Sequence, residues 1–141
     1  MSASGEREPT ALHPELTAQQ RRERIEEGSA LFARGEFFAA HEAWEEVWRS
    51  TTPEPRDLFQ GLVQMAAAFH HLRARRRPDV AARVLDKARR RLTLVGEERA
   101  GLDLPALLAG IEAWEGWLAS GGPAEEPPLP PLRWNSPGTA A

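Results

Sequence analysis

The chain has 141 residues, a net charge of −3 at pH 7 and no Cys, and this length suits a single domain. The lack of Cys excludes disulfides, thiolate chemistry and zinc sites of the Cys type. The first residues do not join a positive segment to an apolar run as a signal peptide does, and no stretch is apolar for long enough to span a bilayer. We therefore expect a soluble, cytoplasmic protein that does not interact with a membrane.

The chain is predicted to begin with an arm and a first helix. Residues 1–16 are polar and contain two Pro, which favours a flexible arm. Thr17 and Gln20 then match a capping box, in which each residue binds a backbone N–H of the other. A helix is predicted from about 18 to 34, because Gly35 can adopt the left-handed conformation that ends a helix.

Three more helices are predicted before a fifth that starts at the N-cap Asp103. The second covers 36–50 and ends before the two Pro of STTPEP, which cannot continue a helix interior. The third, about 55–75, is apolar around most of its circumference, as is typical of a central helix packed on several sides. The fourth covers about 79–95.

The C-terminal residues 121–141 hold six of the 12 Pro and are predicted to form an extended tail. This tail has three apolar residues with which it can lie against the domain, namely Leu129, Leu132 and Trp134. No stretch has the residues of a β-strand. We predict an all-α fold, a compact bundle of about five helices over 17–120, with extended N- and C-terminal tails.

The second predicted helix, FFAAHEAWEEVWRS, carries two Trp, a His and three Glu within a few residues. Successive residues turn by about 100°, so its apolar side chains share one face and point to the core. The predicted core aromatics are Phe38, Trp44 and Trp48. His41 and Glu45 lie at the edge of this face, and Glu42 lies about a quarter turn further.

The third predicted helix carries one polar stripe, formed by Gln60, Gln64 and His71, on an otherwise apolar surface. His70 lies among apolar residues and is predicted to be a partly buried structural His. Buried polar groups need partners, and a short loop makes the second and third helices antiparallel neighbours. We therefore predict that the stripe faces Glu42 and Glu45.

Two interpretations of this cluster remain open. The first is a buried hydrogen-bond network that fixes the register of the two helices. The second is a site for ligand binding or for acid/base chemistry, in which a His beside a Glu acts as general base. Metal binding is disfavoured, because the Glu-x-x-His spacing is absent and the amides of the third helix are poor transition-metal ligands. We expect neither a metal nor a cofactor.

The segments GEFFAAHEAWEEVWR and FQGLVQMAAAFHHL together resemble the signature of a family catalogued as domain of unknown function 309. The matching residues are Phe38, His41, Glu42, Glu45, Trp48, Gln60, Gly61, Leu62, Gln64 and His71. The resemblance covers about residues 25–95 and implies a compact helical protein. The family has no established activity, so the resemblance implies a fold and a site but no reaction.

Residues 73–91 hold nine Arg or Lys against two Asp, and Arg75, Arg76 and Arg77 are candidate anion-binding residues. No aromatic residue interleaves with these cations, which does not favour base stacking in nucleic acid. Three functions follow in order of preference. The first is a structural module that binds a protein partner or a second copy, the second is an enzyme or small-ligand binder using the His/Glu/Gln cluster, and the third is a nucleic-acid binder.

Overall fold

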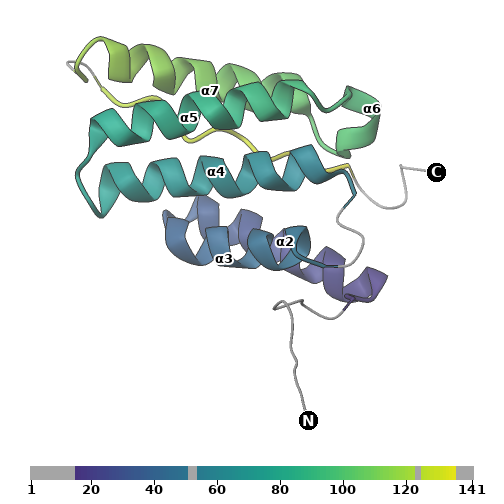
Figure 1. The fold of residues 1–141 in the computed structure, drawn as a ribbon. Helices are drawn as coiled ribbons and strands as arrows, with labels where there is room; N and C mark the ends of the chain where they lie inside the picture. The colour runs from purple at the N-terminus through teal and green to yellow at the C-terminus, as the bar shows by residue number, and fades with distance from the viewer. Residues whose placement is uncertain (1–14, 51–53, 123–124, 136–141) are drawn as a thin grey trace.

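The computed structural model describes residues 15–50, 54–122 and 125–135. In these ranges the chain forms six α-helices and no β-strand, which confirms the predicted all-α bundle. The helices are α2 (Ala18–Ala33), α3 (Phe37–Trp48), α4 (Arg56–Arg73), α5 (Pro78–Thr93), α6 (Glu97–Ala100) and α7 (Leu104–Ala119). Figure 1 shows that α2 packs on α3, α3 on α4, α4 on α5, and α5 on α7. None of the described helices is long and apolar enough to cross a bilayer.

The ends of the helices follow local capping signals. The side chains and backbones of Thr17 and Gln20 form the predicted capping box at the start of α2. Asp103 accepts a hydrogen bond of 3.1 Å from the backbone N–H of Ala106 and so caps α7. The single turn of α6 was not predicted, because four residues are too few to show a helical periodicity.

An aromatic cluster in the core joins four helices. The ring of Phe69 on α4 lies 5.5 Å from Phe32 of α2, 5.3 Å from Phe37 of α3 and 5.0 Å from Trp114 of α7. All four side chains are buried. Edge-on and offset ring pairs at such distances add to the stability that the burial of their apolar area provides. The cluster thereby fixes α2, α3 and α7 around one side of α4.

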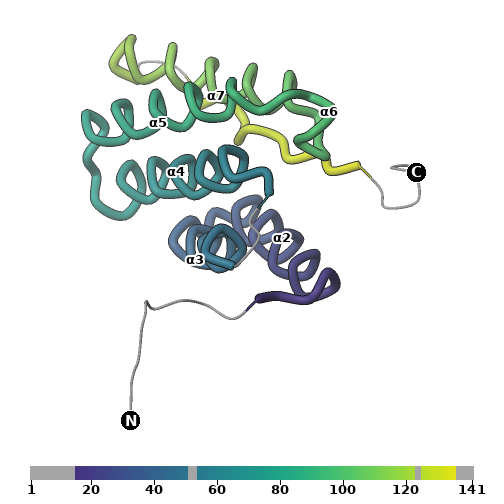
Figure 2. Tube along the Cα trace, turned by 45° about the vertical axis from the view of Figure 1, so that its right-hand side comes forward, coloured from purple at the N-terminus to yellow at the C-terminus, as the bar shows by residue number. Residues whose placement is uncertain are grey.

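The described part of the Pro-rich tail, 125–135, lies along the helices, as Figures 1 and 2 show. Leu129, Leu132 and Trp134 are half-buried and pack against the core, which confirms the expected contact. At the other end of the chain, Leu16 also packs against the core. Residues 1–14 of the predicted arm and 136–141 of the predicted tail lie outside the described residues.

The close contact between α2 and α3 leads to a test of the core. Gly28 of α2 is buried, and a Cβ built on it would overlap the indole of Trp44. We expect Gly28→Ala to lower the free energy of unfolding by about 1–3 kcal/mol, as overpacking does in other cores. Gly116→Ala is the matched control, because a Cβ at Gly116 meets nothing within 4 Å. The control should leave stability unchanged or raise it by up to about 1 kcal/mol. Equal urea midpoints for the two variants would contradict this packing.

Candidate functional site

The α4 helix buries one side and leaves the opposite side half-exposed. Its buried residues are Leu58, Phe59, Gly61, Leu62, Met65, Ala66, Ala68 and Phe69. Its half-exposed residues include Gln60, Val63, Gln64, Ala67, His70 and His71. At about 100° per residue, the two sets occupy opposite arcs of the helix. The predicted polar stripe therefore lies on the arc of α4 that faces away from the core.

The α3 helix corrects one of the predicted core aromatics. Trp44 is fully buried, as expected, and Trp48 is half-buried against the core. Phe38, however, is 53% exposed, so its assignment to the core was wrong. The physical reason is that the neighbouring Phe37 takes the core position, and a rotation of about 100° per residue then directs Phe38 outward.

The exposed ring of Phe38 contacts imidazole rings from both α3 and α4. It lies 5.7 Å from the ring of His41 on α3, in a stacked arrangement, and 5.3 Å from the ring of His70 on α4. The ring of His71 lies 6.3 Å from that of His70. We call Phe38, His41, His70 and His71 the Phe38 patch. The structure thus brings the two predicted site residues His41 and His71 to the same end of the α3–α4 seam.

The other predicted site residues are spread along the seam. Glu42 is exposed, and Glu45 forms an ion pair of 3.3 Å with Arg49 on its own helix. Within the described ranges, no direct hydrogen bond joins any of the six candidate residues to another. Nδ1 of His41 and Oε1 of Gln64 are buried with no hydrogen-bond partner in the described residues. A closed His/Glu/Gln network therefore stays a prediction that these contacts do not support.

The charges around His71 are cationic. Partial desolvation is the main cause that lowers the pKa of His71 below its ordinary value, and Arg75, His70 and Arg77 lower it further. No carboxylate is among the groups that shift this pKa. Arg77 itself forms a 3.6 Å ion pair with Asp79. Because positive charge collects beside an exposed Phe, the patch suits an anionic binding partner better than a cationic one.

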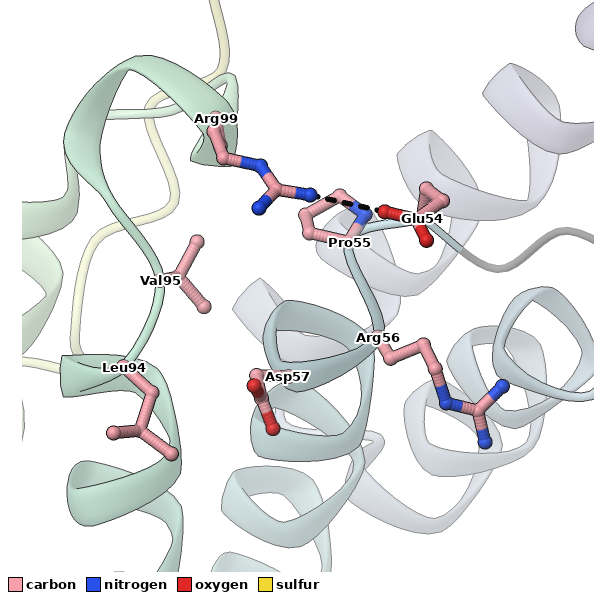
Figure 3. Close-up of a pocket in the computed structure, with 7 residues that line it drawn as sticks. All are labelled: Glu54, Pro55, Arg56, Asp57, Leu94, Val95 and Arg99. Atoms are coloured by element: carbon pink, nitrogen blue, oxygen red, sulfur yellow. Dashed lines mark hydrogen bonds and ion pairs between the residues drawn. The ribbon is translucent and has the colours of Figure 1, made fainter.

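A hollow lies at the start of α4 (Figure 3). Its volume is about 210 Å³. It is lined by Glu54, Pro55, Arg56, Asp57, Leu94, Val95 and Arg99. A 3.0 Å ion pair joins Arg99 to Glu54, and Asp57 pairs with Arg91 at 3.3 Å. Figure 3 shows the Arg56 guanidinium directed away from Leu94, and it lies over the Trp48 ring at 5.5 Å. None of the predicted site residues lines this hollow, and its charged side chains already have partners: Glu54 and Arg99 pair with each other, Asp57 with Arg91, and Arg56 lies over Trp48.

A second, more open hollow of about 600 Å³ lies between α4 and α5 and includes one predicted residue, Gln64. Its other lining residues are Lys87, Arg90, Arg91 and Leu94. Two of these cations are engaged, since Arg90 pairs with Asp86 at 2.9 Å and Arg91 with Asp57. Basic residues thus line this hollow, but ion pairs already neutralise much of their charge.

A metal site gains no support from the described residues. There, no group of three or more His, Asp or Glu side chains could hold a metal ion. The candidate anion-binding residues Arg75, Arg76 and Arg77 are all exposed at the α4–α5 connection. Arg75 and Arg77 are close enough to His71 to lower its pKa, so the structure joins the Phe38 patch to two of these three candidates.

Sequence reasoning misplaced Phe38 and did not connect it with His70. The prediction of a half-buried His70 agrees with its intermediate exposure, but its contact with Phe38 was not expected. The available signal was the adjacent pair Phe37 and Phe38, since at about 100° per residue Phe37 shares the face of Trp44 and Val47, whereas Phe38 lies about 100° away from Phe37.

The comparison with protein-family models finds a match to part of the chain. Residues 25–84, which include α3 and α4 and thus the Phe38 patch, match the model of a family described as Domain of unknown function (DUF309). This match confirms a resemblance to that family over residues 25–84, a shorter stretch than the 25–95 expected from the sequence. No curated protein and no solved structure matches the chain.

A substitution at Glu42 tests whether the polar cluster is a closed network or an open face. Because Glu42 is exposed and no hydrogen bond joins it to α4, we expect Glu42→Gln to change the free energy of unfolding by less than about 0.5 kcal/mol. A buried network would instead lose about 1–3 kcal/mol when one partner is removed. Denaturant unfolding of the wild type and Glu42→Gln distinguishes the two, and a clear loss of stability in the variant would support a buried network instead.

The lowered pKa of His71 predicts how stability depends on pH. The unfolded chain takes up a proton at about the ordinary value of 6.5, before folded His71 does, so stability falls as the pH drops below that value. The loss levels off below the folded pKa. His71→Gln removes this contribution, so the wild type should lose more stability than the variant between about pH 7.5 and 5. Parallel pH profiles, or an NMR titration that gives a raised pKa, would contradict the expectation.

Proposed function

We propose that this chain is a partner-binding helical module, that the Phe38 patch is its recognition surface, and that its partner is a protein with an acidic segment carrying an apolar anchor residue. The observation that carries the proposal is the 53% exposed ring of Phe38 between His41 and His70. Large aromatic side chains that are partly exposed among polar groups are typical of the residues that dominate binding energy in protein interfaces.

The apolar part of the proposal depends on where Phe38 lies. In the described part of the chain, Phe38 and Leu94 are the large apolar residues that are exposed. Phe38 differs from Leu94, which is 71% exposed, because two imidazole rings from two helices hold its ring in place. A side chain that is already ordered loses less conformational entropy on binding, which makes it a good anchor.

The electrostatic part depends on the groups beside the anchor. Arg75 and Arg77 are exposed next to His71, and their charges already disfavour its protonation. A carboxylate from a partner would offset that repulsion, raise the pKa of His71 and draw in a proton. Binding to an acidic segment should therefore tighten as the pH falls toward 6 and weaken as salt screens the charges.

The proposal can be tested by site-specific crosslinking in cells of the source organism. A photocrosslinking residue at position 38 should capture a protein that the same residue at position 94 does not. The captured protein is then identified, purified and measured in solution against three proteins: wild type, Phe38→Ala and Leu94→Ala. We expect Phe38→Ala to weaken binding at least about tenfold, whereas the matched control Leu94→Ala should bind like the wild type.

The controls of this experiment separate folding from recognition. Because Phe38 is exposed, the free energy of unfolding of Phe38→Ala should stay within about 0.5 kcal/mol of that of the wild type. Equal capture at positions 38 and 94, or equal affinity of the two alanine variants, would overturn the proposal. Capture of a nucleic acid that Arg75→Ala and Arg77→Ala release would do so as well and would favour the nucleic-acid alternative.

A further inference from the structure

We infer that the surface beneath the C-terminal tail is a recognition site for extended, Pro-rich peptides, which this chain fills with its own residues 125–135. The peptide side of the site is the sequence EEPPLPPLRWN. The receptor side consists of residues from α2, α4, the α6–α7 connection and α7, namely Ser29, Arg73, Gly101, Asp103, Gly110 and Trp114. We call these six residues the tail track.

The N-terminal end of the peptide is held by charge. Arg73, in the last turn of α4, binds both carboxylate oxygens of Glu126, at 2.6 and 2.7 Å. Such two-pronged Arg–carboxylate pairs fix orientation as well as contributing energy. The hydrogen bond lowers the pKa of Glu126, and the same guanidinium lies 5.7 Å from the ring centre of Trp114. One Arg therefore links the peptide to the aromatic cluster of the core.

The middle of the peptide is recognised by an indole and by a glycine. Trp114 donates a hydrogen bond of 2.8 Å from Nε1 to the carbonyl of Pro128. Pro-rich segments carry no N–H at Pro and offer carbonyl acceptors, so an indole donor suits them. Pro130 is buried, and a Cβ on Gly110 would lie only 2.7 Å from its Cα. The lack of a side chain at Gly110 is what lets the peptide approach α7 so closely.

The C-terminal end of the peptide is held through its backbone and one Trp. The backbone N–H of Asp103 donates to the carbonyl of Arg133 at 2.9 Å, and the N–H of Asn135 donates to Gly101 at 2.8 Å. Trp134 donates from Nε1 to the hydroxyl of Ser29 at 2.7 Å. Polar contacts at both ends, with the Trp114 hydrogen bond and the close packing at Gly110 between them, fix both the direction and the register of the peptide.

These contacts have the features of peptide recognition by surfaces that bind Pro-rich ligands. Four Pro in eleven residues hold the backbone extended before it binds, so docking costs little conformational entropy. Because peptide and track belong to the same chain, the effective concentration of the tail is high. A free peptide of the same sequence should therefore bind only when the tail is weakened.

The experiment uses the full chain and a fluorescent synthetic peptide of residues 125–135. The tail is weakened by Glu126→Arg together with Trp134→Ala, which leaves every residue of the tail track intact. We expect fluorescence anisotropy to show at least about tenfold tighter peptide binding to this variant than to the wild type. A peptide with the same composition in scrambled order should not bind.

Matched changes on α7 test the geometry of the track. In the tail-weakened chain, Gly110→Ala should abolish peptide binding, because its Cβ would collide with the peptide at Pro130. Gly116→Ala, on the same helix with open space around it, should leave binding unchanged. A larger loss of peptide binding in Gly110→Ala than in Gly116→Ala supports the site, whereas equal losses of peptide binding overturn it.

A milder variant keeps the test decisive if the double change harms folding. Glu126→Gln alone removes the ion pair with Arg73 but retains Trp134, and circular dichroism checks its helix content. This variant should bind the peptide more tightly than the wild type and less tightly than the double variant. If neither weakened chain binds the peptide while both remain helical, the tail contacts are packing alone and the inference is wrong.

Discussion

The packing of three aromatic rings around Phe69 is the interaction on which the rest of the structure depends. Phe32, Phe37 and Trp114 come from three other helices and meet Phe69 within 5.5 Å, so a single side chain of α4 fixes α2, α3 and α7. The same Trp114 then donates to the tail at Pro128. The core and the course of the C-terminal segment are therefore parts of one continuous arrangement.

This arrangement also determines which side of α4 is left open. Since Phe69 and its neighbours on the helix fill the core, the opposite arc carries Gln60, Gln64 and His71 at partial exposure. The residues of the predicted polar stripe thus stand partly exposed, along the seam with α3. Exposed polar groups on this seam can be hydrated and need no internal network, whereas Nδ1 of His41 and Oε1 of Gln64 are buried without a partner in the described residues.

The fold could be predicted from the sequence further than the site could. Capping residues such as Thr17 and Asp103 act within a few residues of chain, so their effect is visible in the sequence. Periodicity likewise shows that Gln60, Gln64 and His71 share a face of α4. It does not show whether that face meets a neighbour or solvent, because this depends on how the other helices pack. The contacts of the tail with Ser29 and Gly110 arise from distant parts of the chain, and no local pattern encodes them.

The last turns of α4 connect the two proposed recognition surfaces. His71 belongs to the Phe38 patch and Arg73 holds the tail, and two residues correspond to about 200° of rotation, so the side chains leave opposite sides of the helix. Cationic residues suit this position, because the carbonyl end of a helix carries partial negative charge. Each surface can therefore be occupied without blocking the other. Any coupling between them must pass through the position of the α4 end itself, which Phe69 and its aromatic partners hold one turn earlier.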